Sequence, residues 1–208
     1  MIEHTYTAAD VPALAALHRR AFPDFFLSRL GEPFLRQLYL GYISDPDAVV
    51  SVARAQDGRV VGVCVGTTHP SGFFSRLLKQ RFFGFFGASL LAVLRNPRFA
   101  PRLLAALTYR GDVPPGLDGA LMSSSCVDPD AQNGGIGRAL DDAWRVRAAQ
   151  LGAQTAFLIT DADGNDAVNR FHQRGGWQLS DQYVTSQGRR MNRYRHELAP
   201  EGKESDDG

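Results

Sequence analysis

A glycine-rich turn at residues 132–139 is the first place in the sequence where residue types and spacing indicate chemistry. Residues 120–127 before it (ALMSSSCV) are typical of a strand, and the residues after it carry apolar side chains at helical spacing. Gly134, Gly135 and Gly137 allow the backbone to approach a ligand closely. The first N–H groups of a helix have no internal partner, and the helix dipole favours anions there. The turn is therefore predicted to bind a phosphate or pyrophosphate group.

Two common phosphate-binding motifs are excluded by the residues of this turn. No Lys-Ser or Lys-Thr pair follows the glycines, so the segment is not a P-loop. The third glycine of the dinucleotide fingerprint and its later acidic residue are also missing. The pattern that is present is Gln132-x-x-Gly135-x-Gly137, directly after a strand that ends Val-Asp-Pro.

A second motif runs from Asn165 to Trp177 (NDAVNRFHQRGGW). It is predicted to be a helix that two glycines stop before a strand with an aromatic start. Val168, Phe171 and His172 are expected on one face of this helix.

Together the two motifs resemble those of the GCN5-related N-acetyltransferase (GNAT) superfamily. The first is similar to its acyl-CoA pyrophosphate loop, Arg/Gln-x-x-Gly-x-Gly/Ala, and the second to its Asn-x-x-Ala-x-x-Phe-Tyr-x-x-x-Gly-Phe segment. In this chain Val168 stands for the alanine, His172 for the tyrosine, and Gly176-Trp177 for the closing Gly-Phe. Two motifs at the right distance are far more specific than either alone. The resemblance covers residues 2–198, with the exception of an insertion at 69–111.

This resemblance implies an α/β (α+β) fold with a mixed, mostly antiparallel central sheet flanked by helices. A V-shaped splay is expected between the two central parallel strands, with a helical insertion at about 69–117. Residues 1–198 are expected to form a single acyltransferase domain and residues 199–208 a disordered tail. The implied reaction is direct transfer of an acetyl group from acetyl-CoA to a primary amine, without a metal.

The resemblance also assigns a set of acetyl-CoA-binding residues. The pantetheine arm is expected to pair with the strand at Cys126 and Val127, and the pyrophosphate to meet the N–H groups of residues 134–139. Arg138 is either a counter-charge or a solvent-facing side chain, and Asn165 is expected to hydrogen-bond the arm. The full set is Cys126, Val127, Gln132, Asn133, Gly134, Gly135, Ile136, Gly137, Arg138, Ala139, Asn165 and Phe171.

The catalytic residues depart from the family pattern. The attacking amine, with a pKa of about 10, must lose a proton, and the departing thiolate must be stabilised. The family often uses a strand carboxylate and a tyrosine, but residues 120–127 contain no acid. Ser123 and Ser125 are expected to order a water that relays the proton toward Asp118, Asp128 or solvent. Alternatively, the acceptor arrives neutral and positioning supplies most of the rate.

His172, in place of the tyrosine, is the predicted group for the thiolate, because an imidazole can hydrogen-bond or protonate it. Two alternatives stay open. His172 fills space only, or Tyr183 or Tyr194 on the last strands takes the role.

The rest of the sequence predicts the strands and helices that position the candidate catalytic and cofactor-binding residues. Asp57-Gly58 between two β-branched runs predicts a hairpin. Strand, glycine turn, helix and strand make a βαβ unit whose strands run parallel. The predicted strands are 2–6, 48–55, 60–68, 120–127, 154–160, 178–185 and 189–198, and the predicted helices are 11–21, 28–42 and 136–151.

The insertion at 69–111 contains six arginines, one lysine and no acid, around an uncharged run from Phe82 to Leu94. We favour a helical cover over the acceptor site or a homodimer contact. A basic site for an anionic acceptor, such as a nucleotide-linked sugar, is one alternative, and a membrane-surface patch at 76–110 is another. The aromatic loop at 23–27 either packs on the sheet or forms a wall of the acceptor pocket.

Bulk composition narrows the classes of function. The chain has 208 residues, 44% of them hydrophobic and 22% charged, with a net charge of +1, so no overall charge points to nucleic acid. No signal peptide and no apolar run of membrane-spanning length are evident. Cys64 and Cys126 do not form a disulfide framework and are expected to be buried thiols. These features predict a cytoplasmic protein.

We therefore expect an N-acetyltransferase that acts on a primary amine of a small molecule, such as an amino sugar or its nucleotide derivative. A protein N-terminal or lysine acetyltransferase is the alternative with the same chemistry. A non-catalytic CoA-binding module, with residues 69–111 as a membrane or partner contact, is the alternative from another class.

Overall fold

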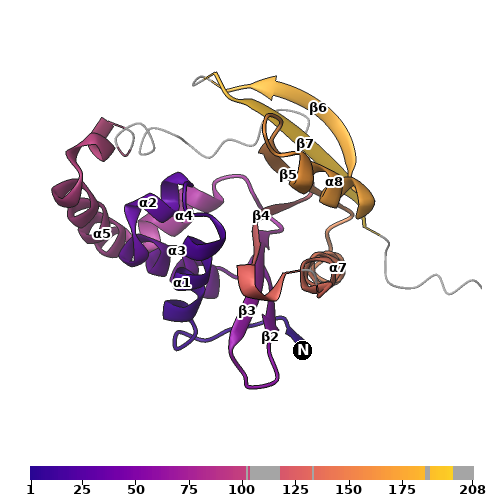
Figure 1. Ribbon diagram of the computed structural model, residues 1–208, viewed down its shortest axis with the longest axis horizontal. Helices are drawn as coiled ribbons and strands as arrows, with labels where there is room; N and C mark the ends of the chain where they lie inside the picture. The colour runs from indigo at the N-terminus through magenta and orange to yellow at the C-terminus, as the bar shows by residue number, and fades with distance from the viewer. Residues whose placement is uncertain (102, 104–117, 133, 186–187, 199–208) are drawn as a thin grey trace, which may run out of the picture.

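The computed structural model describes residues 1–101, 103, 118–132, 134–185 and 188–198 (Figure 1). Its centre is a seven-stranded sheet with the order β1-β2-β3-β4-β5-β7-β6. The β4–β5 pair is parallel, whereas the other neighbouring pairs are antiparallel. The mixed, mostly antiparallel sheet and the βαβ unit are as predicted. The strands are β1 (Ile2–Glu3), β2 (Ala48–Arg54), β3 (Val60–Thr67), β4 (Ala120–Val127), β5 (Thr155–Asp161), β6 (Gln178–Val184) and β7 (Arg190–Glu197).

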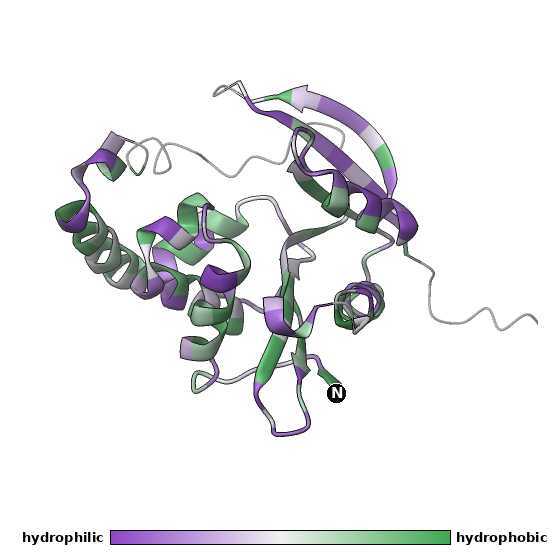
Figure 2. Ribbon diagram, viewed as in Figure 1, coloured by the Kyte–Doolittle hydropathy of each residue, from purple (hydrophilic) through white to green (hydrophobic). Residues whose placement is uncertain are grey.

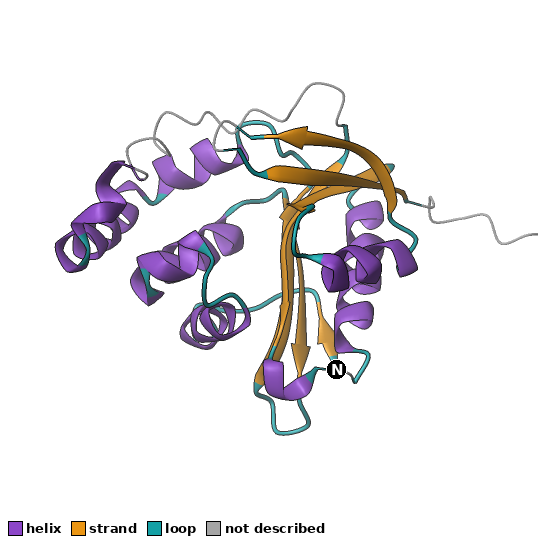
Figure 3. Ribbon diagram, turned by 45° about the horizontal axis from the view of Figure 1, so that its top comes forward, coloured by secondary structure: helices purple, strands orange, loops and turns teal. Residues whose placement is uncertain are grey.

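Helices cover both faces of this sheet (Figure 3). One face carries α1 (Val11–Ala21), α2 (Phe26–Leu30), α3 (Glu32–Ser44), α4 (Phe73–Gln80) and α5 (Phe82–Arg95), followed by the short helix η1 (Pro97–Phe99). The other face carries α7 (Ile136–Gln150) and α8 (Asp166–Arg174), and the short helix η2 (Pro129–Ala131) follows β4. Each helical layer buries its own apolar core against the sheet. Leu14, Leu35 and Tyr39 belong to the first core, and Leu140, Trp144 and Tyr194 to the second.

Two predicted boundaries were wrong, and one predicted residue lies on an exposed face. The helix predicted at 28–42 breaks at Gly31, which separates α2 from α3. Gly31 has a φ of 94°, in the region that favours glycine. The strand predicted at 2–6 ends at Glu3, and Tyr6 instead donates a hydrogen bond of 2.6 Å to the carbonyl of Tyr39 on α3. Val168 is exposed, because α8 turns Asn169 and His172 toward the sheet instead.

The described part of the insertion extends the first helical layer. Its helix α5 packs on α3, where the rings of Phe34 and Phe85 meet edge to face with centroids 5.0 Å apart. It therefore lies beside α3 rather than over β4 and β5 (Figure 1). The helix is strongly hydrophobic (Figure 2), and several of its apolar side chains are exposed, namely Phe82, Phe83, Phe86, Leu90, Leu91 and Leu94. Arg102 and Arg110 lie outside the described residues.

No single helix in the described part of the chain is long and apolar enough to cross a bilayer. The pair α4 and α5 passes on length and composition when taken together, but the two helices bend by 88° at their junction.

Candidate functional site

The two parallel strands part in the middle of the sheet. β4 pairs with β5 only from Ala120 to Met122, opposite Ala156 to Leu158. Beyond that point β4 stays paired with β3 as far as Val127, while β5 stays paired with β7. The facing edges of residues 123–127 and 159–161 are therefore not paired with each other. This is the predicted V-shaped splay, and it offers backbone donors and acceptors to an amide-rich ligand.

A β-bulge lies at the vertex of this splay. Val65 of β3 pairs with Ser124, and the next residue of β3, Gly66, pairs with Met122, so Ser123 is the extra residue on β4. The bulge reverses which face the side chains of β4 point to. Met122 belongs to the core under α7, whereas Cys126 belongs to the core under α1 and α3.

The bulge separates the two serines that the sequence singled out. Ser123 lies near Tyr42 of α3, whose pKa burial raises. Ser125 lies opposite Cys64 of β3, whose pKa burial also raises. The two hydroxyls thus reach the two faces of the sheet. Both cysteines are free and buried, as predicted, and burial raises the pKa of the Cys126 thiol to about 12.

The glycine turn forms the N-terminus of α7. Gly135 is the N-cap residue with a φ of 74°, and no side chain caps the helix. The N–H of Ala139 donates to the carbonyl of Gly135 at 3.0 Å, so the N–H groups of residues 136–138 have no acceptor within the helix. A Cβ built on Gly135 meets nothing within 4 Å, so the turn is open on that side. Asn133 lies outside the described residues.

Three predicted cofactor-binding residues meet beside this turn. A Cβ on Gly137 would lie 3.5 Å from the Phe171 ring and 3.7 Å from Val127. The Arg138 side chain does not simply face solvent. Its Nη2 donates to the carbonyl of Phe171 at 2.9 Å, and its guanidinium lies 4.8 Å from the centre of the Phe171 ring. Arg138 therefore fastens α7 to α8 next to the turn.

Other predicted residues of this region also have structural partners. Asn165 donates to the Thr160 hydroxyl at 2.7 Å and so joins the end of β5 to the start of α8. Asp128 accepts from Arg20 at 2.5 Å and from the N–H of Asp130, which caps η2. Gln132 and Gly134 are exposed, and Ile136 and Ala139 lie in the first turn of α7.

His172 lies on α8 at the level of the splay vertex. Its ring centroid is 6.0 Å from that of Tyr194, and Tyr194 pairs with Leu158, the last residue of β5 that pairs with β4. Burial, with a further contribution from the positive charge of Arg138, lowers the pKa of His172 to about 4. The ring is therefore neutral near pH 7, and its Nδ1 has no hydrogen-bond partner among the described residues.

Tyr194 belongs to a buried polar network that the sequence did not reveal. Its hydroxyl donates to Asn169 Oδ1 at 3.0 Å, and Asn192 donates to the same oxygen at 2.8 Å. Asn169 in turn donates to the carbonyl of Asp161. The network joins α8 to β5 and β7, so it holds the His172 helix against the sheet.

Asp141 of α7 is a second position that sequence reasoning missed. Its carboxylate is almost completely buried, accepts from the Trp177 indole at 3.0 Å and pairs with Arg145 at 3.1 Å. Burial raises its pKa, against the effect of Arg145. The available signal was its spacing, because Arg138 and Arg145 lie three residues before and four residues after Asp141.

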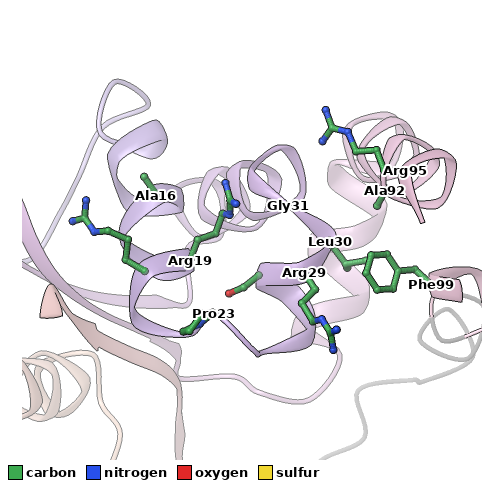
Figure 4. A pocket seen from close by; sticks show the side chains of 11 residues that line it. Ala16, Arg19, Pro23, Arg29, Leu30, Gly31, Ala92, Arg95 and Phe99 are labelled. Carbon is green, nitrogen blue, oxygen red and sulfur yellow. The ribbon is translucent and has the colours of Figure 1, made fainter. Parts of the chain in front are cut away.

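A cavity of about 600 Å³ lies in the first helical layer rather than beside the splay (Figure 4). Four arginines line it, from α1, α2 and α5. It is connected to the end of β4 through Arg20, which pairs with Asp128. The lining residues are Ala16, Arg19, Arg20, Pro23, Ser28, Arg29, Leu30, Gly31, Ala92, Arg95 and Phe99.

No group of three or more His, Cys, Asp or Glu side chains that could hold a metal ion occurs in the part of the chain that the structure describes.

Comparison with known proteins identifies the family of this arrangement. The family model described as the acetyltransferase (GNAT) family matches residues 11–177. No curated protein matches the chain by sequence.

Solved structures with the same fold include acetyltransferases of proteins and of small molecules. A ribosomal-protein-alanine N-acetyltransferase from Brucella melitensis is 19% identical, with a TM-score of 0.60 and coverage of 95% of this chain and 99% of that chain. A ribosomal-protein-S18-alanine N-acetyltransferase from Escherichia coli is 17% identical, with a TM-score of 0.57 and coverage of 98% and 97%. A phosphinothricin acetyltransferase from Sinorhizobium meliloti, in complex with acetyl-CoA, is 15% identical, with a TM-score of 0.60 and coverage of 98% and 90%. At these identities the likeness concerns the fold.

Proposed function

The chain belongs to the GNAT acetyltransferase family and is an acyl-CoA-dependent N-acetyltransferase, and we propose that its acceptor is the primary amine of a small molecule. An amino sugar or a nucleotide-linked sugar is the class we favour. The observation that supports acetyl-CoA as the co-substrate is the splay at Met122 and Leu158, which lies next to a helix N-terminus without a side-chain cap. These two features suit the two ends of CoA, its amide-rich arm and its pyrophosphate.

The chain's own residues fit this co-substrate. Acetyl-CoA supplies a thioester that a neutral amine attacks, with release of the CoA thiol. The edge of β4 at residues 123–127 would hold the pantetheine amides, and the N–H groups of residues 136–138 would hold the pyrophosphate. Phe171, fixed by Arg138, would close the side of the turn next to Val127.

Two groups handle protons in this proposal. Ser123, on the face of the first helical layer, would order water next to the acceptor amine, because β4 carries no carboxylate and Asp128 is already paired with Arg20. Ser125 reaches the other face of the sheet, beside Cys64, so it takes no part in this step. His172 is neutral, so it would act as a hydrogen-bond donor to the departing thiolate rather than as a charged acid. General-base help is then small, and positioning supplies most of the rate.

The acceptor would bind in the cavity of the first helical layer, which Arg20 links to the end of β4 through its ion pair with Asp128. The cavity volume of about 600 Å³ is in the range of small-molecule sites. Screening a panel of amines by release of free CoA thiol tests the proposal, with amino sugars and short peptides as separate groups. Turnover of amino sugars supports it. Turnover of peptides alone favours protein acetylation, and CoA binding without any turnover favours a binding module.

A further inference from the structure

The cavity in the helical layer has an unusual charge pattern for a space of its size. Among the described residues, its lining contains four arginines and no Asp or Glu. Arg20 is compensated by Asp128 at 2.5 Å, and Arg19 lies 3.9 Å from Glu32. Neither Arg29 nor Arg95 forms an ion pair or a side-chain hydrogen bond with any described residue. Within the described part of the chain, the exposed side chains of Arg29 and Arg95 therefore have no charge partner at this cavity.

Two uncharged groups of the lining point to the same class of ligand. Ser28 is buried, and its hydroxyl has no hydrogen-bond partner among the residues that the structure describes. Such a group costs free energy unless a ligand satisfies it. Gly31 is the N-cap of α3, which has no side-chain cap, so the first N–H groups of a thirteen-residue helix begin at the cavity wall.

We propose that this cavity binds the phosphate group of a soluble organic phosphate, with Arg29 and Arg95 as the charge partners and Ser28 as a hydrogen-bond donor. Guanidinium groups match phosphate oxygens in bidentate geometry, and two uncompensated charges match a dianion. The volume of about 600 Å³ admits a whole nucleoside diphosphate or sugar phosphate. That this phosphate is part of the amine acceptor rests on the proposed function.

Calorimetry on the protein saturated with CoA tests the site, because CoA then occupies the turn at 132–139. Inorganic pyrophosphate and uridine diphosphate serve as probes. The double variant Arg29→Gln/Arg95→Gln is expected to bind both at least about tenfold more weakly than wild type. The control Arg147→Gln/Arg195→Gln removes two positive charges outside the cavity lining, and its affinity is expected to stay within about twofold of wild type.

Two further measurements distinguish loss of the site from misfolding, and a soluble phosphate from a lipid headgroup. Because Arg29 and Arg95 have no side-chain partner in the described structure, the double variant is expected to keep the melting temperature within about 2 °C of wild type. Absence of probe binding by wild type, or equal weakening in both double variants, would overturn the proposal. Capture of wild type on phosphatidylglycerol vesicles without binding of the soluble probes would also overturn it, in favour of a lipid headgroup.

Kinetics connects the site to the acceptor. In the double variant, KM for glucosamine 6-phosphate is expected to rise about tenfold, while KM for glucosamine stays within about twofold. If wild type acetylates amines but the soluble probes do not bind, the phosphate site fails and the proposed function stands. If the probes bind at Arg29 and Arg95 but no amine is acetylated, the proposed function fails and the site stands.

Discussion

Burial among Phe171, Trp177 and Tyr194 sets the protonation state of His172, because a charged imidazole loses its hydration there. With a pKa of about 4 the ring is neutral in the range where a primary amine begins to lose its proton. A tyrosine hydroxyl, which the family often has at this position, is likewise a neutral donor at neutral pH. The substitution of His172 for tyrosine therefore conserves a neutral donor rather than introducing a cation.

Replacing His172 by phenylalanine tests this role. The ring volume and the packing on Trp177 are retained, but the donor is lost. We expect kcat to fall roughly 100-fold, within the range for residues that handle protons, and KM for acetyl-CoA to change little. Steady-state kinetics measures both constants, and an unchanged kcat contradicts the proposed role.

Tyr194→Phe is the matched variant, because it removes the other polar group next to His172. The Tyr194 hydroxyl already donates to Asn169, so its loss is expected to lower the free energy of unfolding by about 1–2 kcal/mol and to leave kcat within about threefold. A large loss of kcat with unchanged stability would instead give the catalytic role to Tyr194. Urea unfolding and kinetics on the same preparation decide between them.

At the scale of the elements, the turn at the start of α7 requires a glycine at position 135. Gly135 has a φ of 74° and an open side, so an alanine there both strains the backbone and places a methyl group at the turn. We expect Gly135→Ala to lower the free energy of unfolding by about 1–2 kcal/mol and to weaken CoA binding roughly tenfold.

Gly58→Ala in the hairpin between β2 and β3 is the control. Gly58 has a φ of 84° and also has nothing within 4 Å of a built Cβ. The loss of stability is therefore expected to be the same, while CoA affinity stays unchanged. Calorimetric titration of CoA against both variants gives the comparison, and equal affinities would remove the turn from the binding site.

The contact between α7 and the segment that joins α8 to β6 depends on Asp141. Asp141→Ala leaves the Trp177 indole and Arg145 without their buried acceptor, and we expect a loss of about 3 kcal/mol in the free energy of unfolding. Asp142→Ala is the neighbouring control. Asp142 is half-exposed and also pairs with Arg145, so its removal is expected to cost less than about 1 kcal/mol. If urea unfolding shows the same loss of free energy of unfolding in both variants, the buried carboxylate stabilises the fold no more than the half-exposed one.

At the scale of the whole molecule, the sequence predicted those elements whose signals are local. Asp57-Gly58 specified the β2–β3 hairpin, and the glycine turn with its helical pattern specified β4 and α7. The splay followed from the resemblance and was confirmed by the end of pairing at Met122. These features depend on neighbours in the chain or on motifs that a family repeats.

What the sequence did not predict depends on partners that are distant in the chain. The apolar spacing of Leu30, Phe34 and Leu38 runs unbroken across Gly31, so periodicity alone could not place the break. The Asn169 network joins α8, β5 and β7, and the arginines of the cavity come from α1, α2 and α5. Only the folded chain brings Arg29 of α2 and Arg95 of α5 to the same cavity.

The stability of the whole molecule should depend on pH through two buried histidines. His18 packs between Phe22 and Tyr39, and burial lowers its pKa to about 4, as it does for His172. In the unfolded chain both rings titrate near 6.5, so between pH 6.5 and 4 the unfolded state binds more protons. The stabilisation is therefore complete above pH 6.5 and is lost as the pH falls toward 4, by about 3 kcal/mol for each ring.

Urea unfolding at pH 7.5, 6 and 5 measures this dependence. We expect the midpoint of wild type to fall over that range, and the fall to be smaller in His18→Phe/His172→Phe, whose rings have no proton to gain on unfolding. His69→Gln is the control, since the His69 side chain is 71% exposed rather than buried. The same slope in all three proteins would show that the acid sensitivity comes from the carboxylates, which titrate mostly below pH 5, and not from the two buried rings.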